Sequence, residues 1–222
     1  SKIIENTFQD GSYGIRIRHS KGTYLVDNNV RKFTFFGVEL DSSGNTTLRN
    51  NKIADNRYNF GVDGASLFDF TNDIDTSNTV NGKPVRYLIN WHNVSIDSAT
   101  FQDLGYLALI NSSNIRVRDL NVQNNMQGVL FAFTVNSTVI NVNAKNNWNG
   151  IYVTHSRNTT VSGNNANSNF DYGIKFYDSS RSVARDNNVD NNGWAGIGAF
   201  GSPNSIIDVN KAIFNTYYWK MV

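Results

Sequence analysis

NNWNGIYVTHSRNTTV, residues 146–161, contains an asparagine pair, a glycine, an alternating apolar–polar run and a second short β-branched run, in that order. Read alone, its tryptophan, tyrosine and histidine suggest a ligand-binding site. The same order of residues recurs along the chain, however. The stretch is therefore one unit of a repeat, and this repeat decides the fold.

A glycine followed by a β-branched or aromatic residue marks each unit, and these glycines recur about every 22 or 23 residues. Each unit carries short β-type runs separated by corners rich in Asn, Ser and Gly, and no run shows a sustained helical period. The pattern predicts an all-β, right-handed parallel β-helix of about nine rungs with three short strands per rung. The glycines are Gly14, Gly37, Gly61, Gly82, Gly105, Gly128, Gly150, Gly173 and Gly196.

Stacked rungs bring equivalent positions into columns. Asparagine at a corner tolerates left-handed backbone angles, and its amide can bond to the amides above and below it. We therefore interpret the asparagine pairs as structural ladders. The residue after each glycine, such as Ile151, and the residue two further on, such as Val153, should point into the core.

Composition excludes several classes of function. The chain has 20 basic and 18 acidic residues without a basic stripe, which argues against nucleic acid as a partner. It has no cysteine and no apolar run long enough to span a membrane. We expect one domain, residues 1–222, with an excursion loop near residues 66–82. Because the chain starts without Met and its ends lack polar caps, we expect a module of a longer chain or assembly, or end-to-end self-association.

The Asn-rich repeat resembles the NosD-type, or carbohydrate-binding-and-sugar-hydrolase, β-helix repeats found in archaeal cell-surface proteins. Residues 72–85, NDIDTSNTVNGKPV, carry the most specific part of that resemblance. The resemblance implies an exported, extracellular or cell-surface solenoid associated with polysaccharide or envelope glycans. The copper role of the namesake protein lacks support here, because His19 and His155 lie in distant rungs and no cluster of two histidines with a carboxylate exists.

Outward positions of the first strand form a charged column in the early rungs. One interpretation is a polysaccharide lyase or epimerase, in which carboxylates bind sugar or Ca²⁺ and a basic group abstracts a proton. The other is that opposite charges on neighbouring rungs simply pair, which we favour. The residues are Arg16, Arg18, Glu39, Asp41, Asp63 and Arg86.

The late rungs carry aromatic side chains at corresponding positions. Such rings suit the apolar faces of sugars, although tryptophan and tyrosine also pack half-buried with a polar tip exposed. We expect glycan contacts at Trp148, Tyr152, Lys175, Tyr177, Trp194 and Phe200.

Two further sets of polar residues carry weaker predictions. Asp69, Asp73 and Asp75 could bind Ca²⁺, the only cofactor considered, but their spacing matches no known Ca²⁺ loop. Five Asn-X-Ser/Thr sequons, at Asn45, Asn93, Asn111, Asn136 and Asn158, are candidate glycosylation sites.

The sequence favours a non-catalytic, exported β-helix module that binds glycans. Two alternatives stay open: a lyase or epimerase acting on acidic polysaccharide, and a self-assembling structural subunit. The Tyr-Gly-Phe-Asp-Pro-His motif of epimerases is represented only by Tyr172-Gly173, which counts against that activity.

Overall fold

The computed structural model describes residues 1–221, and the fold is an all-β, right-handed parallel β-solenoid of about nine turns, as predicted. By its internal contacts the chain divides into two compact units. Unit 1 comprises residues 1–87, 103–107 and 124–126, and unit 2 comprises residues 88–102, 108–123 and 127–222. The described residues contain one helix, α1. It has four residues, too few to span a membrane.

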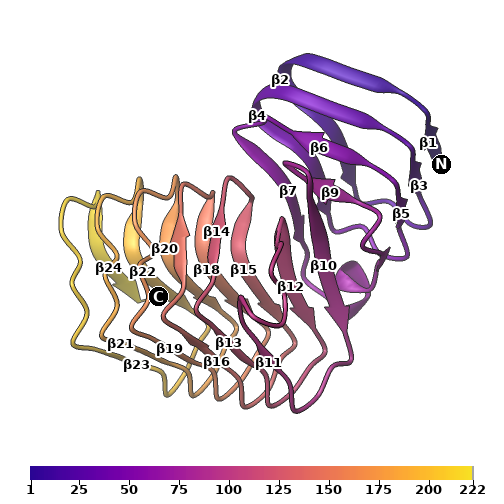
Figure 1. Ribbon diagram of the computed structural model, residues 1–222. Coiled ribbons are helices and arrows are strands. Elements are labelled where there is room, and N and C mark those ends of the chain that lie inside the picture. The colour runs from indigo at the N-terminus through magenta and orange to yellow at the C-terminus, as the bar shows by residue number, and fades with distance from the viewer. Residues whose placement is uncertain (222) are drawn as a thin grey trace. The chain divides into compact units, whose positions relative to one another are not determined.

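Unit 1 is built from parallel strands of successive rungs (Figure 1). One sheet has the order β1-β3-β5-β8, and a second contains β2, β4, β6, β7 and β9. Their bounds are β1 Lys2–Ile4, β2 Thr7–Arg18, β3 Tyr24–Val26, β4 Asn29–Asp41, β5 Thr47–Arg49, β6 Lys52–Ala54, β7 Tyr58–Asp63, α1 Leu67–Phe70, β8 Asp73–Ile74 and β9 Thr79–Val80. Two strands, β10 Lys83–Ile89 and β12 Tyr106–Ile110, begin in unit 1 and end in unit 2.

Unit 2 has the three strands per rung that the repeat predicts, with the third one short. First strands pair in the order β15-β18-β20-β22-β24, second strands in the order β11-β13-β16-β19-β21-β23, and β14 pairs with β17. Single bridges such as Asn165↔Asn188 continue the third column. The bounds are β11 Ser95–Ile96, β13 Arg116–Arg118, β14 Asn121–Gln123, β15 Gln127–Ala132, β16 Thr138–Ile140, β17 Asn143–Lys145, β18 Asn149–Thr154, β19 Thr160–Ser162, β20 Tyr172–Tyr177, β21 Val183–Arg185, β22 Ala195–Phe200, β23 Ile206–Asp208 and β24 Tyr217–Met221.

The register of these strands stacks like residues on like. Val129 pairs with Ile151, Ile151 with Ile174, and Ile174 with Ile197, and all four side chains are buried. The predicted inward positions are therefore confirmed. The rung that follows Gly105 gives no alternation, because every residue of β12 is buried.

Buried asparagine ladders run along both units. In unit 1, the Asn28 amide donates to Asn51 Oδ1 at 2.9 Å, and the Asn51 amide donates to Asn78 Oδ1 at 2.8 Å. In unit 2, Asn169 Oδ1 accepts the backbone N–H of Asn147, and its amide donates to Asn192 Oδ1 at 3.0 Å. Each ladder satisfies corner backbone groups that burial would otherwise leave unpaired.

The recurring glycines are required by close approach of the next rung. A β-carbon at Gly150 would lie 2.5 Å from the carbonyl oxygen of Gly173 and 2.8 Å from the amide nitrogen of Asn169. Both distances are shorter than a carbon side chain can make without displacing its neighbour.

Residues 66–82, the expected excursion, contain α1 and two strands that stay in register with the coil. β8 pairs in parallel with β5, and β9 pairs in parallel with β6. Gly82, at φ +78°, lies in the turn of an antiparallel hairpin between β9 and β10. This hairpin turn distinguishes it from the other repeat glycines.

Unit 1 is completed by residues from later in the chain. The backbone N–H of Asn59 donates to the carbonyl of Asn124 at 2.7 Å, and that of Met126 donates to Phe60 at 3.0 Å. The ring of Tyr106, fully buried, packs edge-on against Phe60 with centroids 4.9 Å apart. Residues 1–87 therefore lack part of their own core.

We predict that Asn169→Ala lowers the free energy of unfolding by about 1–3 kcal/mol, because it leaves buried partners in the ladder unpaired. Chemical denaturation measures this. Asn121→Ala is the matched control, since Asn121 is exposed and accepts from Asn143 at 3.1 Å outside the core. Equal losses from both variants would contradict a structural role of the buried ladder.

Candidate functional site

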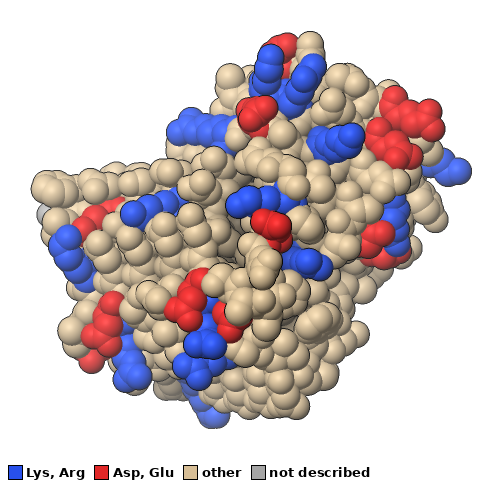
Figure 2. Space-filling view, viewed as in Figure 1, with Lys and Arg blue, Asp and Glu red and all other residues tan. Residues whose placement is uncertain are grey.

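The charged column of the early rungs contains two ion pairs. Arg16 pairs through Nε with Glu39, whose side chain is 7% exposed, and Arg18 Nε lies 2.8 Å from Asp41 Oδ2. Each pair joins residues directly opposite each other in β2 and β4. Figure 2 shows basic and acidic side chains interspersed over the visible face. In these two pairs the carboxylates are already engaged by guanidinium groups.

The other two charged candidates lie on later strands of the same series. Asp63 ends β7, opposite Asp41, and its Oδ1 accepts the N–H of Gly64 at 2.9 Å. Arg86 lies half-buried in the middle of β10. Asp63 thus extends the column that Arg18 and Asp41 begin.

The three predicted calcium ligands have other partners. Asp73 and Asp75 both contact Arg49, at 2.5 and 3.2 Å, and Asp69 accepts from Ser66 at the start of α1. Within residues 1–221 no group of three or more His, Asp or Glu side chains is placed to hold a metal ion. These three carboxylates are therefore each engaged within the fold.

Two tyrosine rings, of the predicted Tyr152 and of Tyr172, pack around Lys175 in unit 2. The ammonium group lies 5.2 Å from the ring centroids of both Tyr152 and Tyr172, within the range of cation–π attraction. Tyr152, directly opposite Lys175 in β18, is only 4% exposed. Its expected outward orientation does not give it an open surface.

Burial changes the acid–base properties of this cluster. Desolvation raises the pKa of Asp171, although Lys175 and a hydrogen bond from Trp148 oppose the rise. Desolvation, with the nearby Asp171 charge, also raises the pKa of Tyr172 to about 12. Both groups therefore favour their neutral forms more than exposed groups would.

The remaining predicted rings divide between two surfaces. Trp148 stacks on Phe170 with centroids 4.3 Å apart, and Trp194, 38% exposed, precedes β22. Tyr177, 41% exposed, is the last residue of β20 and lies opposite Phe200, the last residue of β22. Tyr177 directly precedes Asp178, which lines an open cavity in unit 2.

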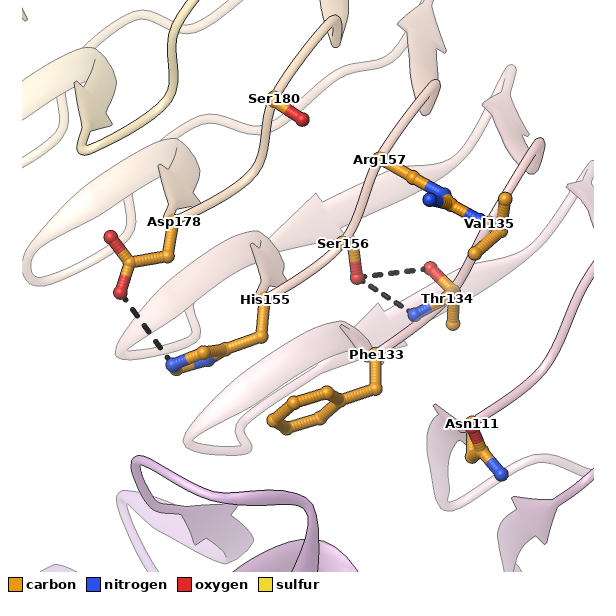
Figure 3. Close-up of a pocket in the computed structure, with 9 residues that line it drawn as sticks. All are labelled: Asn111, Phe133, Thr134, Val135, His155, Ser156, Arg157, Asp178 and Ser180. Atoms are coloured by element: carbon orange, nitrogen blue, oxygen red, sulfur yellow. Dashed lines mark hydrogen bonds and ion pairs between the residues drawn. The ribbon is translucent and has the colours of Figure 1, made fainter.

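This cavity, the corner groove, has a volume of about 460 Å³ and opens where the first strands end (Figure 3). One side is a column of residues in left-handed conformation on successive rungs, and the other is a column of residues that bridge in parallel. The lining residues are Asn111, Phe133, Thr134, Val135, His155, Ser156, Arg157, Asp178 and Ser180.

Aromatic rings follow the first side of the corner groove. The rings of Phe133 and His155 are stacked, 4.8 Å apart at 12°, and the ring of Tyr177 lies 5.9 Å beyond His155. His155 Nδ1 is 2.8 Å from Thr154 Oγ1, and its Nε2 is 3.5 Å from Asp178 Oδ2. The imidazole is thus held between a ring and a carboxylate on neighbouring rungs.

The base of the corner groove is a ladder of buried hydroxyl groups. Ser156 Oγ accepts from the backbone N–H of Thr134 at 2.9 Å, and Ser179 Oγ does the same for Ser156 at 3.2 Å. Arg157 is exposed on the second side. The base is hydrogen-bonded within the fold, so the groups open to a ligand are those on the two sides.

The sequence pattern predicts no binding role for His155 and does not identify the corner groove. The available signal was the position five residues after each repeat glycine. That position holds Phe133, His155 and Asp178, and φ values of 56°, 48° and 47° place all three in the left-handed region. Phenylalanine is a rare choice there.

All five sequon asparagines have left-handed backbone angles. All except Asn111 lie at the corner two residues before a second strand. The left-handed backbone at these corners itself favours asparagine. In the sequons of Asn136 and Asn158 the next residue, Ser137 or Thr159, is buried. Asn158 donates to Asn136 Oδ1 at 2.9 Å one rung away. Glycans on both would have to share a rung spacing of about 4.8 Å, so the two are predicted alternative acceptors.

Known proteins resemble the chain at the level of its fold. A sequence model of the right-handed β-helix region matches residues 1–85 and 87–218. None of the curated proteins matches the chain.

Among solved structures, the periplasmic alginate epimerase AlgG is 16% identical over 96% of this chain, with a TM-score of 0.45. The A-module of mannuronan C-5 epimerase AlgE4 from Azotobacter vinelandii is 14% identical over 99% of this chain and 78% of its own, with a TM-score of 0.46. The enzymatically active domain of tailspike protein 2 from bacteriophage CBA120 is 12% identical over 97% of this chain and 39% of its own, with a TM-score of 0.43. The chain spans 50% of the AlgG structure.

We predict that in the Tyr172→Phe variant the free energy of unfolding falls less steeply as the pH rises through the alkaline range. Between pH 10 and about 12 the unfolded chain has released this phenol proton and the folded chain has not, so stability falls as pH rises. One such group contributes a slope of at most about 1.4 kcal/mol per pH unit. Urea unfolding across this range measures the slope, with Tyr24→Phe at an exposed position as control. An unchanged slope in Tyr172→Phe would contradict the assignment.

Proposed function

The chain belongs to the right-handed β-helix family, and from that premise we propose that it is a non-catalytic, exported module that binds a glycan chain along the corner groove. The observation that carries the proposal is the row of rings at Phe133, His155 and Tyr177, which rises one rung at a time beside an open cavity. Sugar rings present apolar faces to such side chains and hydroxyl groups to the polar residues beside them.

Polar groups flank this row at the spacing of the coil. Asp178 accepts hydrogen bonds, Arg157 donates them, and Asn111 does both. These three residues belong to three different rungs, so a ligand that uses all of them extends along the solenoid axis. A linear polymer fits that arrangement better than a single small molecule.

The backbone at Phe133 supports a role for its ring. A non-glycine residue in the left-handed region costs roughly 1–2 kcal/mol, and asparagine relieves part of that cost. Neighbouring rungs use Asn90 and Asn111 at this corner. Phe133 adopts the same strained backbone conformation without a side chain that lowers its free-energy cost, as residues at functional positions often do.

The ion pairs of the charged column support a structural role for it rather than catalysis. Arg16 and Arg18 are each held by a carboxylate on the next rung, which suits a structural role. Polysaccharides and envelope glycans lie outside the cell, so an extracellular or cell-surface location is part of the proposal. The asparagine-rich repeat supports a place among NosD-type surface proteins.

We predict that Phe133→Ala and Tyr177→Ala each weaken binding about tenfold, since removing one stacked ring should cost about 1.4 kcal/mol. Affinity electrophoresis through gels containing alginate, pectate or a neutral mannan measures the dissociation constants. Tyr24→Ala, which removes a ring 47% exposed in unit 1, is the matched control and should change nothing.

Failure of the unmodified protein to bind any of the three polysaccharides would overturn the proposal. Equal binding by the Phe133→Ala variant and the unmodified protein would move the site away from the corner groove. Thermal unfolding of every variant separates lost contacts from lost folding.

One observation favours a second function, that of a lyase or epimerase acting on acidic polysaccharide. His155 lies between Thr154 and Asp178 with Arg157 on the adjoining side, which provides a base and a cation for a sugar carboxylate.

If this second function holds, His155→Ala should lower turnover of alginate or pectate at least a hundredfold, the usual size of a general-base contribution. Arg16→Ala should leave turnover intact. Release of unsaturated ends or a change of uronate configuration is the readout, and turnover unaffected by His155→Ala would remove this function.

A further inference from the structure

Trp91 continues the corner groove two rungs before Phe133. Parallel bridges join His92 to Ser113 and Ser113 to Val135, which places Trp91 in register with Ser112 and Thr134. The backbone N–H of Trp91 donates to Ser112 Oγ at 3.0 Å, the same bond that Thr134 makes to Ser156. Trp91 thus occupies the position that later rungs fill with a small hydroxyl residue at the base of the groove.

The side chain at this position changes from buried to exposed. Ser112, Thr134 and Ser156 are 2%, 0% and 4% exposed, whereas Trp91 is 37% exposed. An indole is too large for the space that a serine fills inside the turn. It therefore presents an apolar face to solvent at the end of a row of polar positions.

Both sides of the corner groove extend to this rung. The Asn111 amide donates to Asn90 Oδ1 at 2.6 Å, and His92 Nδ1 lies 2.8 Å from Ser113 Oγ. Asn111 itself lines the cavity of Figure 3. Polar side chains therefore connect the rung of Trp91 to the cavity on each side without interruption.

We propose that Trp91, with Asn90 and His92, forms a separate sugar subsite at the end of the corner groove. It would stack one sugar ring of a linear polysaccharide whose other residues contact Phe133 and His155. Two rung spacings of about 4.8 Å place Trp91 roughly 10 Å along the axis from Phe133. Only an oligosaccharide long enough to cover that distance contacts both Trp91 and Phe133. The subsite therefore favours long oligosaccharides over short ones.

This inference rests on the proposed glycan binding, and chain length separates the two. Isothermal titration of the full chain uses a short and a long oligosaccharide from whichever polysaccharide binds best in the gels. Trp91→Ala should weaken binding of the long oligosaccharide five- to tenfold and that of the short one less than twofold. Trp91→Tyr keeps a stacking ring and should restore most of the loss.

Phe133→Ala should weaken both lengths, and Tyr24→Ala should weaken neither. If Trp91→Ala leaves the long oligosaccharide unaffected while Phe133→Ala still weakens binding, the subsite is wrong and the groove stands. An equal loss for both lengths in Trp91→Ala would likewise overturn selection by length. Absence of binding by the unmodified protein would remove both proposals.

Discussion

Stacking of one rung on the next at a fixed hydrogen-bond spacing is the constraint on which the structure depends. Parallel strands satisfy their backbone groups only through the rungs above and below, so a rung has no stable form alone. The corners must meet the same spacing, and ladders such as Asn147–Asn169–Asn192 supply the partners that backbone alone cannot. The cost of an unpaired buried amide makes these corners as important as the apolar core.

The same constraint creates the candidate site. Because each position repeats at one rung spacing, a side chain at a corner becomes one member of a column along the axis. Phe133 and His155 lie in sequence on one such column although 22 residues apart, and the ring of Tyr177 lies 5.9 Å from His155 on the next rung. A ligand that itself repeats can match a surface built in this way, whereas a compact ligand meets only one or two rungs.

The sequence was sufficient for the fold class, the inward positions and the ladders, because each depends on a periodic requirement that every rung must meet. Ile151 and Asn169 could be placed by counting from a glycine. Two kinds of feature escaped that method. The hairpin at Gly82 breaks the period, and pairing of β7 with residues 124–126 joins segments about 65 residues apart that no local pattern connects.

Side-chain exposure was the harder part of the site, because alternation gives a direction and not an amount of open surface. Alternation predicts an outward Tyr152, yet its side chain is 4% exposed, whereas His155, one residue beyond β18, borders the cavity. The feature that distinguishes the candidate site is the left-handed corner. Backbone strain there favours asparagine, so an aromatic residue at this corner indicates a role other than folding. A departure from the residue that a repeat position requires is therefore more informative in this fold than the residues that conform to it. By that criterion Trp91 and Phe133, rather than the charged column, are the positions at which we propose ligand contact.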